Sequence, residues 1–174
     1  MPLAALDLLL ADESATHALA QALALAWTQH PCPRLLMTLE GDLGAGKTTF
    51  ARAFLRALGV QGRIKSPSFS LVETYRIAIP DLQFKGTLQM PAYHIDLYRF
   101  SDPQEWEDSG LREIVGERGA SLIEWPQHAQ GLLPQADLSL SLVPSGTQRV
   151  GQLVAGSEVG MTMLNAVPER LKSG

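Results

Sequence analysis

In the N-terminal third of the chain, the spacing of hydrophobic residues changes from that of a strand to that of a helix. A nearly continuous apolar run at residues 3–10 indicates a strand. Residues 12–14 then supply side chains that favour the start of a helix, and Leu19, Leu23 and Trp27 recur at helical spacing. We therefore predict a strand followed by an amphipathic helix.

The same order follows a second time. Pro31 and Pro33 are expected to end the first helix, and the apolar residues 35–39 predict a strand that runs straight into a glycine-rich turn. A second helix is predicted from Thr48, with Gly59 as its C-terminal stop.

The middle of the chain predicts more strands and one short helix. Residues 66–75 and 92–98 are strand-like, whereas the poorly patterned residues 76–90 between them are expected to form a solvated insertion loop. Residues 102–105, Asp-Pro-Gln-Glu, are typical of a helix start. The short apolar run 120–123 predicts a strand that is covered on both faces.

The C-terminal part predicts a pair of strands and an ambiguous tail. Residues 137–143 alternate polar and apolar positions, and residues 149–155 are expected to pair with them. The tail after Gly156 has no clear pattern, although a helix is expected near residues 161–170. Strands that alternate with helices over residues 1–174 predict a single α/β domain around a mixed, mostly parallel sheet flanked by helices.

Composition narrows the function classes. With 174 residues, 45% of them hydrophobic and 18% charged, the chain is expected to form one globular domain. The net charge of −4 argues against a broad basic surface, so stable direct binding of tRNA or other nucleic acid is not expected. Cys32 is the single cysteine, which excludes an internal disulfide and fits a cytoplasmic location. The apolar runs are shorter than the roughly 20 residues that span a membrane.

The glycine-rich turn matches the phosphate-binding pattern G-x-x-x-x-G-K-S/T at every position. Its residues are Gly41, Asp42, Leu43, Gly44, Ala45, Gly46, Lys47 and Thr48. Such a loop wraps its backbone N–H groups around phosphate oxygens. Lys47 is expected to reach the β- and γ-phosphates, Thr48 to bind Mg²⁺ through its hydroxyl, and Thr49 to lie near the α-phosphate. The fold class is therefore a P-loop NTPase-like domain.

Two carboxylates are candidates for the metal. Glu124 ends a predicted buried strand, and Asp96 shares one face of its strand with His94 and Tyr98. The sequence leaves open which of the two acids binds the ion directly. Because the Asn-Lys-x-Asp segment with which GTPases read guanine is missing, ATP with Mg²⁺ is the expected ligand.

Four segments together carry a family resemblance. They are residues 41–50, 66–72, 94–99 and 123–126. In this order they resemble the bacterial TsaE family, also called YjeE, the ATPase component of the system that makes N6-threonylcarbamoyladenosine in tRNA. The resemblance runs from about residue 10 to residue 149.

The resemblance implies roles for single residues. Lys47 would bind phosphate, Thr48 and Glu124 would be the metal ligands, and Asp96 would be the acid needed for hydrolysis. The other implied positions are a switch-like loop of Ser66, Pro67, Ser68 and Phe69, an aromatic residue beside the nucleotide, Trp125, and two residues near its base or ribose, Thr16 and Arg149. The chain departs from the family where serines at positions 68 and 70 replace the usual threonines.

The resemblance also implies partners. In that family the transfer step takes place on TsaD paired with TsaB, so this chain would dock on that pair and reset it by hydrolysing ATP. Two other readings remain open. A small-molecule kinase needs an arginine-bearing lid, for which Arg112, Arg118 and Arg149 are too scattered. A non-hydrolysing nucleotide sensor would use ATP only to change its docking affinity.

Overall fold

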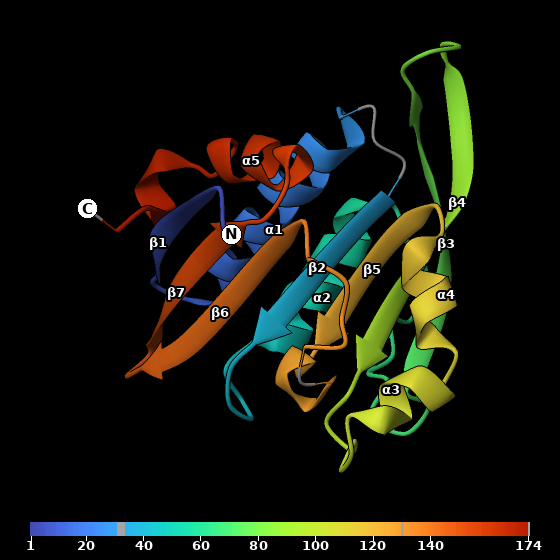
Figure 1. Ribbon diagram of the computed structural model, residues 1–174. Coiled ribbons are helices and arrows are strands. Elements are labelled where there is room, and N and C mark those ends of the chain that lie inside the picture. The colour runs from blue at the N-terminus through green and yellow to red at the C-terminus, as the bar shows by residue number, and fades with distance from the viewer. Residues whose placement is uncertain (31–33, 130, 174) are drawn as a thin grey trace.

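One seven-stranded sheet organises the described part of the chain (Figure 1). The computed structural model describes residues 1–30, 34–129 and 131–173, so the predictions for Pro31, Cys32 and Pro33 lie outside the described residues. The strands are β1 (Ala4–Leu10), β2 (Arg34–Glu40), β3 (Val72–Asp81), β4 (Gly86–Asp96), β5 (Gly119–Glu124), β6 (Leu138–Ser145) and β7 (Gln148–Ala155).

The sheet is mixed, and most of its strands share one direction. Its order is β1-β7-β6-β2-β5-β4-β3. The central neighbours β6–β2, β2–β5 and β5–β4 are parallel, and the three outer pairs are antiparallel. Of the seven described strands, only β7 and β3 run against the other five. The predicted mixed, mostly parallel sheet is confirmed.

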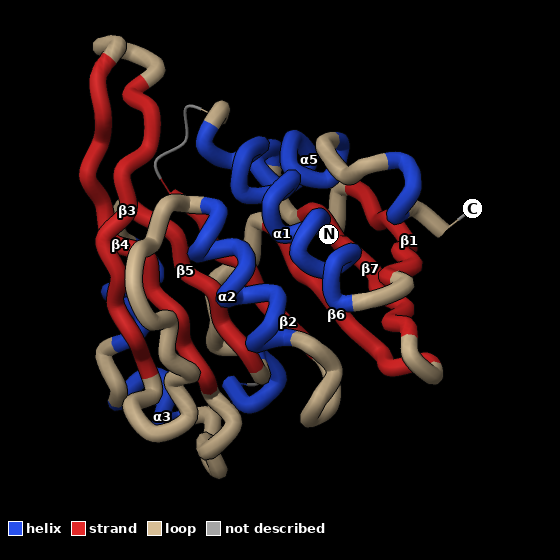
Figure 2. Tube along the Cα trace, turned by 180° about the vertical axis from the view of Figure 1, so that it is seen from behind, coloured by secondary structure: helices blue, strands red, loops and turns tan. Residues whose placement is uncertain are grey.

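Helices cover both faces of this sheet. They are α1 (Glu13–Thr28), α2 (Lys47–Ala57), α3 (Gln104–Asp108), α4 (Leu111–Gly116) and α5 (Glu158–Asn165), with the short 3-10 turns η1 (Pro126–Ala129) and η2 (Glu169–Leu171). Helices α1, α2 and α5 lie on one face (Figure 2), and α3 and α4 lie on the other (Figure 1). None of the described helices has the length and apolar character needed to cross a bilayer.

The alternation of side chains along β2 divides the core into two layers. Leu35, Met37 and Leu39 are buried with residues of α1, α2 and α5. Leu36 points to the opposite face, where it is buried with Trp106 of α3. Strand β2 therefore has apolar residues on both sides, as is typical of a central parallel strand.

The first helix begins, and the second helix ends, where the sequence predicts, whereas the second helix begins one residue earlier than predicted, at Lys47. The Asp12 carboxylate accepts a hydrogen bond from the Ala15 amide at 2.9 Å and caps α1, and Leu19, Leu23 and Trp27 of that helix are fully buried. Helix α2 ends before Gly59, whose φ of 91° is the left-handed conformation that glycine tolerates.

The prediction of a strand over residues 66–75 is wrong in its first half. Strand β3 begins only at Val72, and residues 66–71 form an irregular loop. Pro67 has no amide to give to a ladder, and Leu71 has a φ of 65°, which a strand does not permit. The hydroxyls of Ser66 and Ser68 bond to each other at 2.7 Å instead.

The predicted insertion loop at residues 76–90 is also wrong, because these residues form the outer half of a β-hairpin. Strands β3 and β4 pair in unbroken register from Val72 with Ile95 to Asp81 with Gly86, and the hairpin extends beyond β5 (Figure 1). The Asp81 carboxylate accepts the amides of Gln83 and Phe84, which builds the turn.

The C-terminal tail belongs to the core. Ser157 caps α5 by accepting the Gly160 amide, and the Val159 and Met163 side chains are buried in the layer that contains α1. The helix expected near residues 161–170 begins earlier, at Glu158, and ends at Asn165.

Candidate functional site

The glycine-rich loop lies between β2 and α2 and has a backbone that only glycines adopt readily. Gly41, Gly44 and Gly46 have φ values of 145°, 78° and 106°. A Cβ atom on Gly41 would come within 2.5 Å of the Leu142 carbonyl oxygen. The hydrogen bond from the Phe50 amide to the Gly46 carbonyl, 2.9 Å long, opens α2. The amides before Phe50 therefore have no acceptor within the helix and face the loop.

Lys47 is a buried cation inside this loop. Its Nζ donates to the carbonyl oxygens of Gly41 and Asp42 at 2.6 and 3.0 Å and lies 4.1 Å from the centre of the Trp125 ring. Only 4% of Lys47 is exposed, and burial lowers the pKa of its amine, an effect that the nearby Glu124 carboxylate opposes. A cation held among carbonyls next to free amides fits an anionic ligand such as phosphate.

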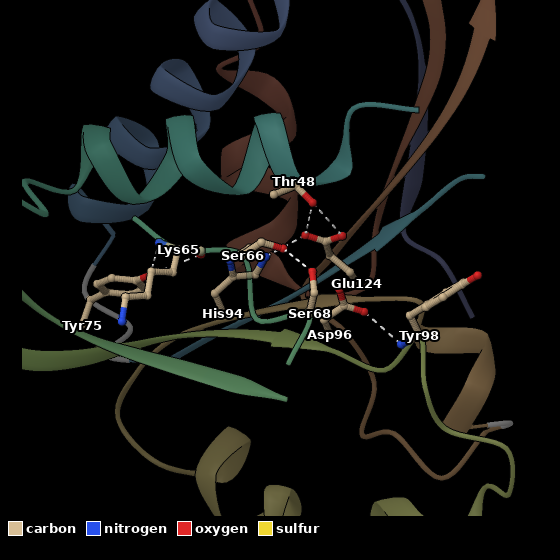
Figure 3. Close-up of polar contacts among 9 residues, drawn as sticks. All are labelled: Thr48, Lys65, Ser66, Ser68, Tyr75, His94, Asp96, Tyr98 and Glu124. Atoms are coloured by element: carbon tan, nitrogen blue, oxygen red, sulfur yellow. Dashed lines mark hydrogen bonds and ion pairs between the residues drawn. The ribbon is translucent and has the colours of Figure 1, made fainter. Parts of the chain in front are cut away.

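Glu124 connects Thr48 with His94 (Figure 3). The Thr48 hydroxyl donates to the two carboxylate oxygens at 2.9 and 3.1 Å, and His94 Nε2 lies 2.7 Å from Oε1. Glu124 is 2% exposed and His94 is fully buried. His94 Nδ1 has no hydrogen-bond partner among the described residues, so Nε2 is the nitrogen that orients the ring. The carboxylate is therefore fixed on the Thr48 side of the cradle.

Replacing His94 with leucine is expected to lower the free energy of unfolding by about 2–4 kcal/mol, because the buried Glu124 carboxylate would lose a hydrogen-bond donor. His94→Gln is the matched control, since its side-chain amide can supply a similar donor, and should cost less than about 1.5 kcal/mol. Urea denaturation measures both variants. Equal losses would show that the His94 ring stabilises the fold by packing alone.

Asp96 lies beside Glu124 at the carboxyl ends of β4 and β5, where the two residues pair in register. Its Oδ1 accepts the Tyr98 amide at 2.9 Å. Burial raises the pKa of Asp96, and the neighbouring Glu124 charge raises it further. Asp96, Glu124 and the nearby Thr48 hydroxyl, all at the carboxyl ends of these strands, form a donor set that suits Mg²⁺.

No group of three or more His, Cys, Asp or Glu side chains in the described ranges has the arrangement of a metal site. The residues present therefore fit an ion that takes one or two oxygens from the protein and the rest from phosphate and water, which is the usual mode for Mg²⁺.

These groups surround one pocket of about 430 Å³. Most of the predicted site residues line it: Leu43, Gly44, Gly46, Lys47, Thr48, Thr49, Ser66, Ser68, Asp96, Glu124, Trp125 and Arg149. From the predicted switch-like loop, Ser66 and Ser68 reach the pocket, Pro67 is buried, and the Phe69 ring is 89% exposed.

Thr16 and Arg149 meet at a second, adjoining pocket of about 260 Å³. Gly46, Thr49 and Arg149 line both pockets, so the two pockets are neighbours at the start of α2. The Arg149 guanidinium donates to the Ala45 carbonyl oxygen at 3.0 Å and so also supports the loop. Thr16 and Arg149 come from α1 and β7, which lie far apart in the sequence.

Three residues at the site were missed by sequence reasoning as site residues. Tyr98 and His128 form an aromatic group with Trp125, with ring centres 5.0 and 5.6 Å from that of Trp125, and Arg99 lines the phosphate pocket. Tyr98 and Arg99 lie within the segment 94–99 that the sequence singles out, which was the available signal. His128 offered none, because its place depends on the turn after β5.

Comparisons with known proteins identify related sequences and a similar fold. The family model "Threonylcarbamoyl adenosine biosynthesis protein TsaE" matches residues 10–150. The tRNA threonylcarbamoyladenosine biosynthesis protein TsaE of Haemophilus influenzae is 39% identical over 137 residues, which is 79% of this chain and 80% of that protein. The protein of the same name from Bacillus subtilis is 38% identical over 66% of this chain and 65% of its own length.

A solved structure is similar over nearly the whole chain. The crystal structure of Bacillus subtilis YdiB superposes with a TM-score of 0.70 and 28% sequence identity, and the match covers 94% of each chain. A family match over 141 of 174 residues, together with relatives that share more than a third of their aligned residues, identifies the group. The chain belongs to the TsaE family of threonylcarbamoyl adenosine biosynthesis proteins.

Proposed function

We propose that this chain is a magnesium-dependent ATPase that acts in the threonylcarbamoylation of tRNA adenosine. One observation carries the proposal: Lys47, the Thr48–Glu124 pair and Asp96 converge on a single glycine-rich cradle. Family membership supports the pathway, because the relatives are named for threonylcarbamoyladenosine biosynthesis.

The cradle would hold the phosphates and the metal. Lys47 would exchange its bonds to the loop carbonyls for phosphate oxygens, and the amides at the start of α2 would bind the same anion. Thr48 with Glu124 would hold Mg²⁺, which when bound would neutralise charge on the β- and γ-phosphates.

Asp96 would assist hydrolysis by orienting the attacking water and accepting its proton. Its raised pKa brings the carboxylate closer to the operating pH, which suits a general base. Glu124 instead lies against the Thr48 hydroxyl, the other group proposed for the metal, and His94 fixes its position. Of the two acids, we therefore propose Asp96 for the water and Glu124 for the metal.

The base and ribose would lie in the adjoining pocket beside Thr16 and Arg149. The preference for adenine over guanine rests on the missing Asn-Lys-x-Asp segment. Trp125 would close the phosphate side, since its ring already covers Lys47.

Docking on a partner is supported by apolar side chains around the site. Leu43, Phe69 and Tyr98 are large, hydrophobic and exposed at 69%, 89% and 47%. Leu43 and Tyr98 line the phosphate pocket, and Phe69 lies next to Ser68, which also lines it. We propose that TsaD and TsaB cover this surface and that hydrolysis resets their complex between turnovers.

A small-molecule kinase receives no support from the arginines that would form its lid. Arg112 is bound to the Glu107 carboxylate and the Leu132 carbonyl. Arg118 directly precedes β5, so it lies at the amino ends of the parallel strands, opposite the site. Arg149 supports the loop.

The proposal predicts slow ATP hydrolysis by the purified chain and a rise of at least about tenfold when TsaB and TsaD are added together, because a partner can complete the site and order its loops. Steady-state phosphate release measures both rates. Single-turnover assays with the partners distinguish this ATPase from the remaining alternative, a non-hydrolysing nucleotide sensor. Tight ATP binding without any phosphate release would instead make the chain a nucleotide sensor.

A further inference from the structure

Arg99 is a cation at the phosphate pocket that makes no hydrogen bond or ion pair within the described residues. Lys47 and Arg149, the other two cations that line this pocket, both donate to carbonyl oxygens of the glycine-rich loop. Arg99 instead places its guanidinium carbon 4.8 Å from the centre of the Phe69 ring. The Arg99 side chain is exposed, so it is free to reorient toward a ligand in the pocket.

The Phe69 side chain is exposed, as the Arg99 side chain is. Its ring is 89% exposed, so its packing comes mainly from the guanidinium. The loop that carries Phe69 is held by the Ser66–Ser68 hydroxyl bond, by the buried Pro67 and by backbone bonds of Leu71 to Pro67 and Asp96, and none of these contacts involves the Phe69 side chain. The Phe69 ring can therefore move without disturbing the core.

Arg99 would bind a terminal phosphate more strongly than it binds the Phe69 ring. An exposed cation–π contact favours its state by only about two- to fivefold, whereas a guanidinium binds phosphate through charged and often bidentate hydrogen bonds. Asp96 and Glu124 lower the positive potential that Lys47 and Arg149 create in the pocket, so a further cation there would strengthen the binding of a triphosphate.

We propose that Arg99 is the residue that distinguishes a nucleoside triphosphate from a diphosphate. Its guanidinium contacts the terminal phosphate and leaves the Phe69 ring, which frees the Phe69 side chain. With a diphosphate the Arg99–Phe69 contact stays closed. This inference rests on the proposed function, and it adds a residue and a nucleotide-dependent state of the Phe69 side chain.

Calorimetric binding of a non-hydrolysable ATP analogue and of ADP, both with Mg²⁺, tests the proposal. Arg99→Ala should weaken binding of the triphosphate about 10- to 100-fold and binding of ADP less than threefold. Arg112→Ala removes the same charge outside the pocket and should change neither affinity. Equal weakening of both ligands by Arg99→Ala, or no weakening, would overturn the inference.

Phe69→Ala gives an independent readout. It removes the competitor for Arg99, so triphosphate affinity should rise about two- to fivefold in the otherwise unchanged chain and stay constant in the Arg99→Ala background. The NMR signals of the Phe69 ring should differ between the triphosphate and ADP complexes, and this difference should vanish in Arg99→Ala. A Phe69→Ala effect that persists without Arg99 would contradict the coupling.

The two levels of the hypothesis fail differently. If the unchanged chain binds no nucleotide, the proposed function and this inference both fall. If binding depends on Lys47 while preference for the triphosphate is unaffected by Arg99→Ala, the proposed function stands and only the role of Arg99 is lost.

Discussion

Replacing Lys47 with alanine is expected to weaken ATP binding by about 100-fold or more and to abolish measurable hydrolysis. The Lys47 ammonium lies inside the glycine-rich loop, with two carbonyl oxygens as its acceptors. A charged hydrogen bond contributes about 1.5–3 kcal/mol, and 1.4 kcal/mol corresponds to a factor of ten in affinity. Removing a cation that, as proposed, would bridge two phosphates therefore accounts for a loss of this size.

The folded state should tolerate this change. Burial lowers the pKa of Lys47, which means that the fold disfavours the charged form. We expect the free energy of unfolding of Lys47→Ala to stay within about 1.5 kcal/mol of the unchanged chain. Calorimetric titration with Mg-ATP and a thermal melt give the two numbers, with Lys172→Ala as a control lysine outside the pocket. ATP affinity within threefold of the unchanged chain would refute the cradle as the binding site.

Features set by neighbouring residues could be predicted from the sequence. The Asp12 cap, the glycine-rich loop and the stop at Gly59 depend on contacts or backbone angles within a few residues, and each has its signature in the chain. The pairing of β6 with β7 is equally local, since a two-residue turn joins them.

Features that depend on register between distant segments could not be predicted. Asp96 and Glu124 each mark the end of a strand, but their adjacency requires β4 to lie next to β5 in one register. The same register brings His94 to Glu124. No sequence pattern indicates that the buried His94 imidazole bonds to the Glu124 carboxylate.

The hairpin over residues 72–96 was not predicted for a different reason. Its turn is built by the Asp81 carboxylate without an Asn-Gly or Asp-Gly pair, and Pro80 weakens the strand pattern just before it. Because β3 is an edge strand, Pro80 leaves no bond unmade in the centre of the sheet. Ile77 and Ile79, spaced two positions apart, were the signal in the sequence that residues 76–90 are ordered, and both side chains are buried in the structure.

Replacing Asp96 with asparagine is expected to lower ATP turnover by about 100-fold or more while ATP affinity changes less than threefold. A general base contributes about 10²–10⁴ to a rate, and an amide cannot accept the proton. Asparagine has nearly the same shape and can still accept the Tyr98 amide, so the site should keep its geometry. Single-turnover hydrolysis in the presence of the partners measures the loss, with Asp7→Asn on β1 as the matched change of charge.

The same substitution should make the protein more stable, which separates a catalytic acid from a structural one. Burial and the Glu124 charge raise the pKa of Asp96, so the folded state binds the proton more tightly than the unfolded state and an ionised Asp96 destabilises the fold at neutral pH. Asp96→Asn should therefore add about 0.5–1 kcal/mol to the free energy of unfolding at pH 7, a small gain because the carboxylate is partly solvated. The gain should shrink as the pH falls toward the ordinary aspartate range, where the unchanged protein also becomes neutral at this position. Urea denaturation at several pH values measures it, and a loss of stability at pH 7 would instead assign Asp96 to holding the fold.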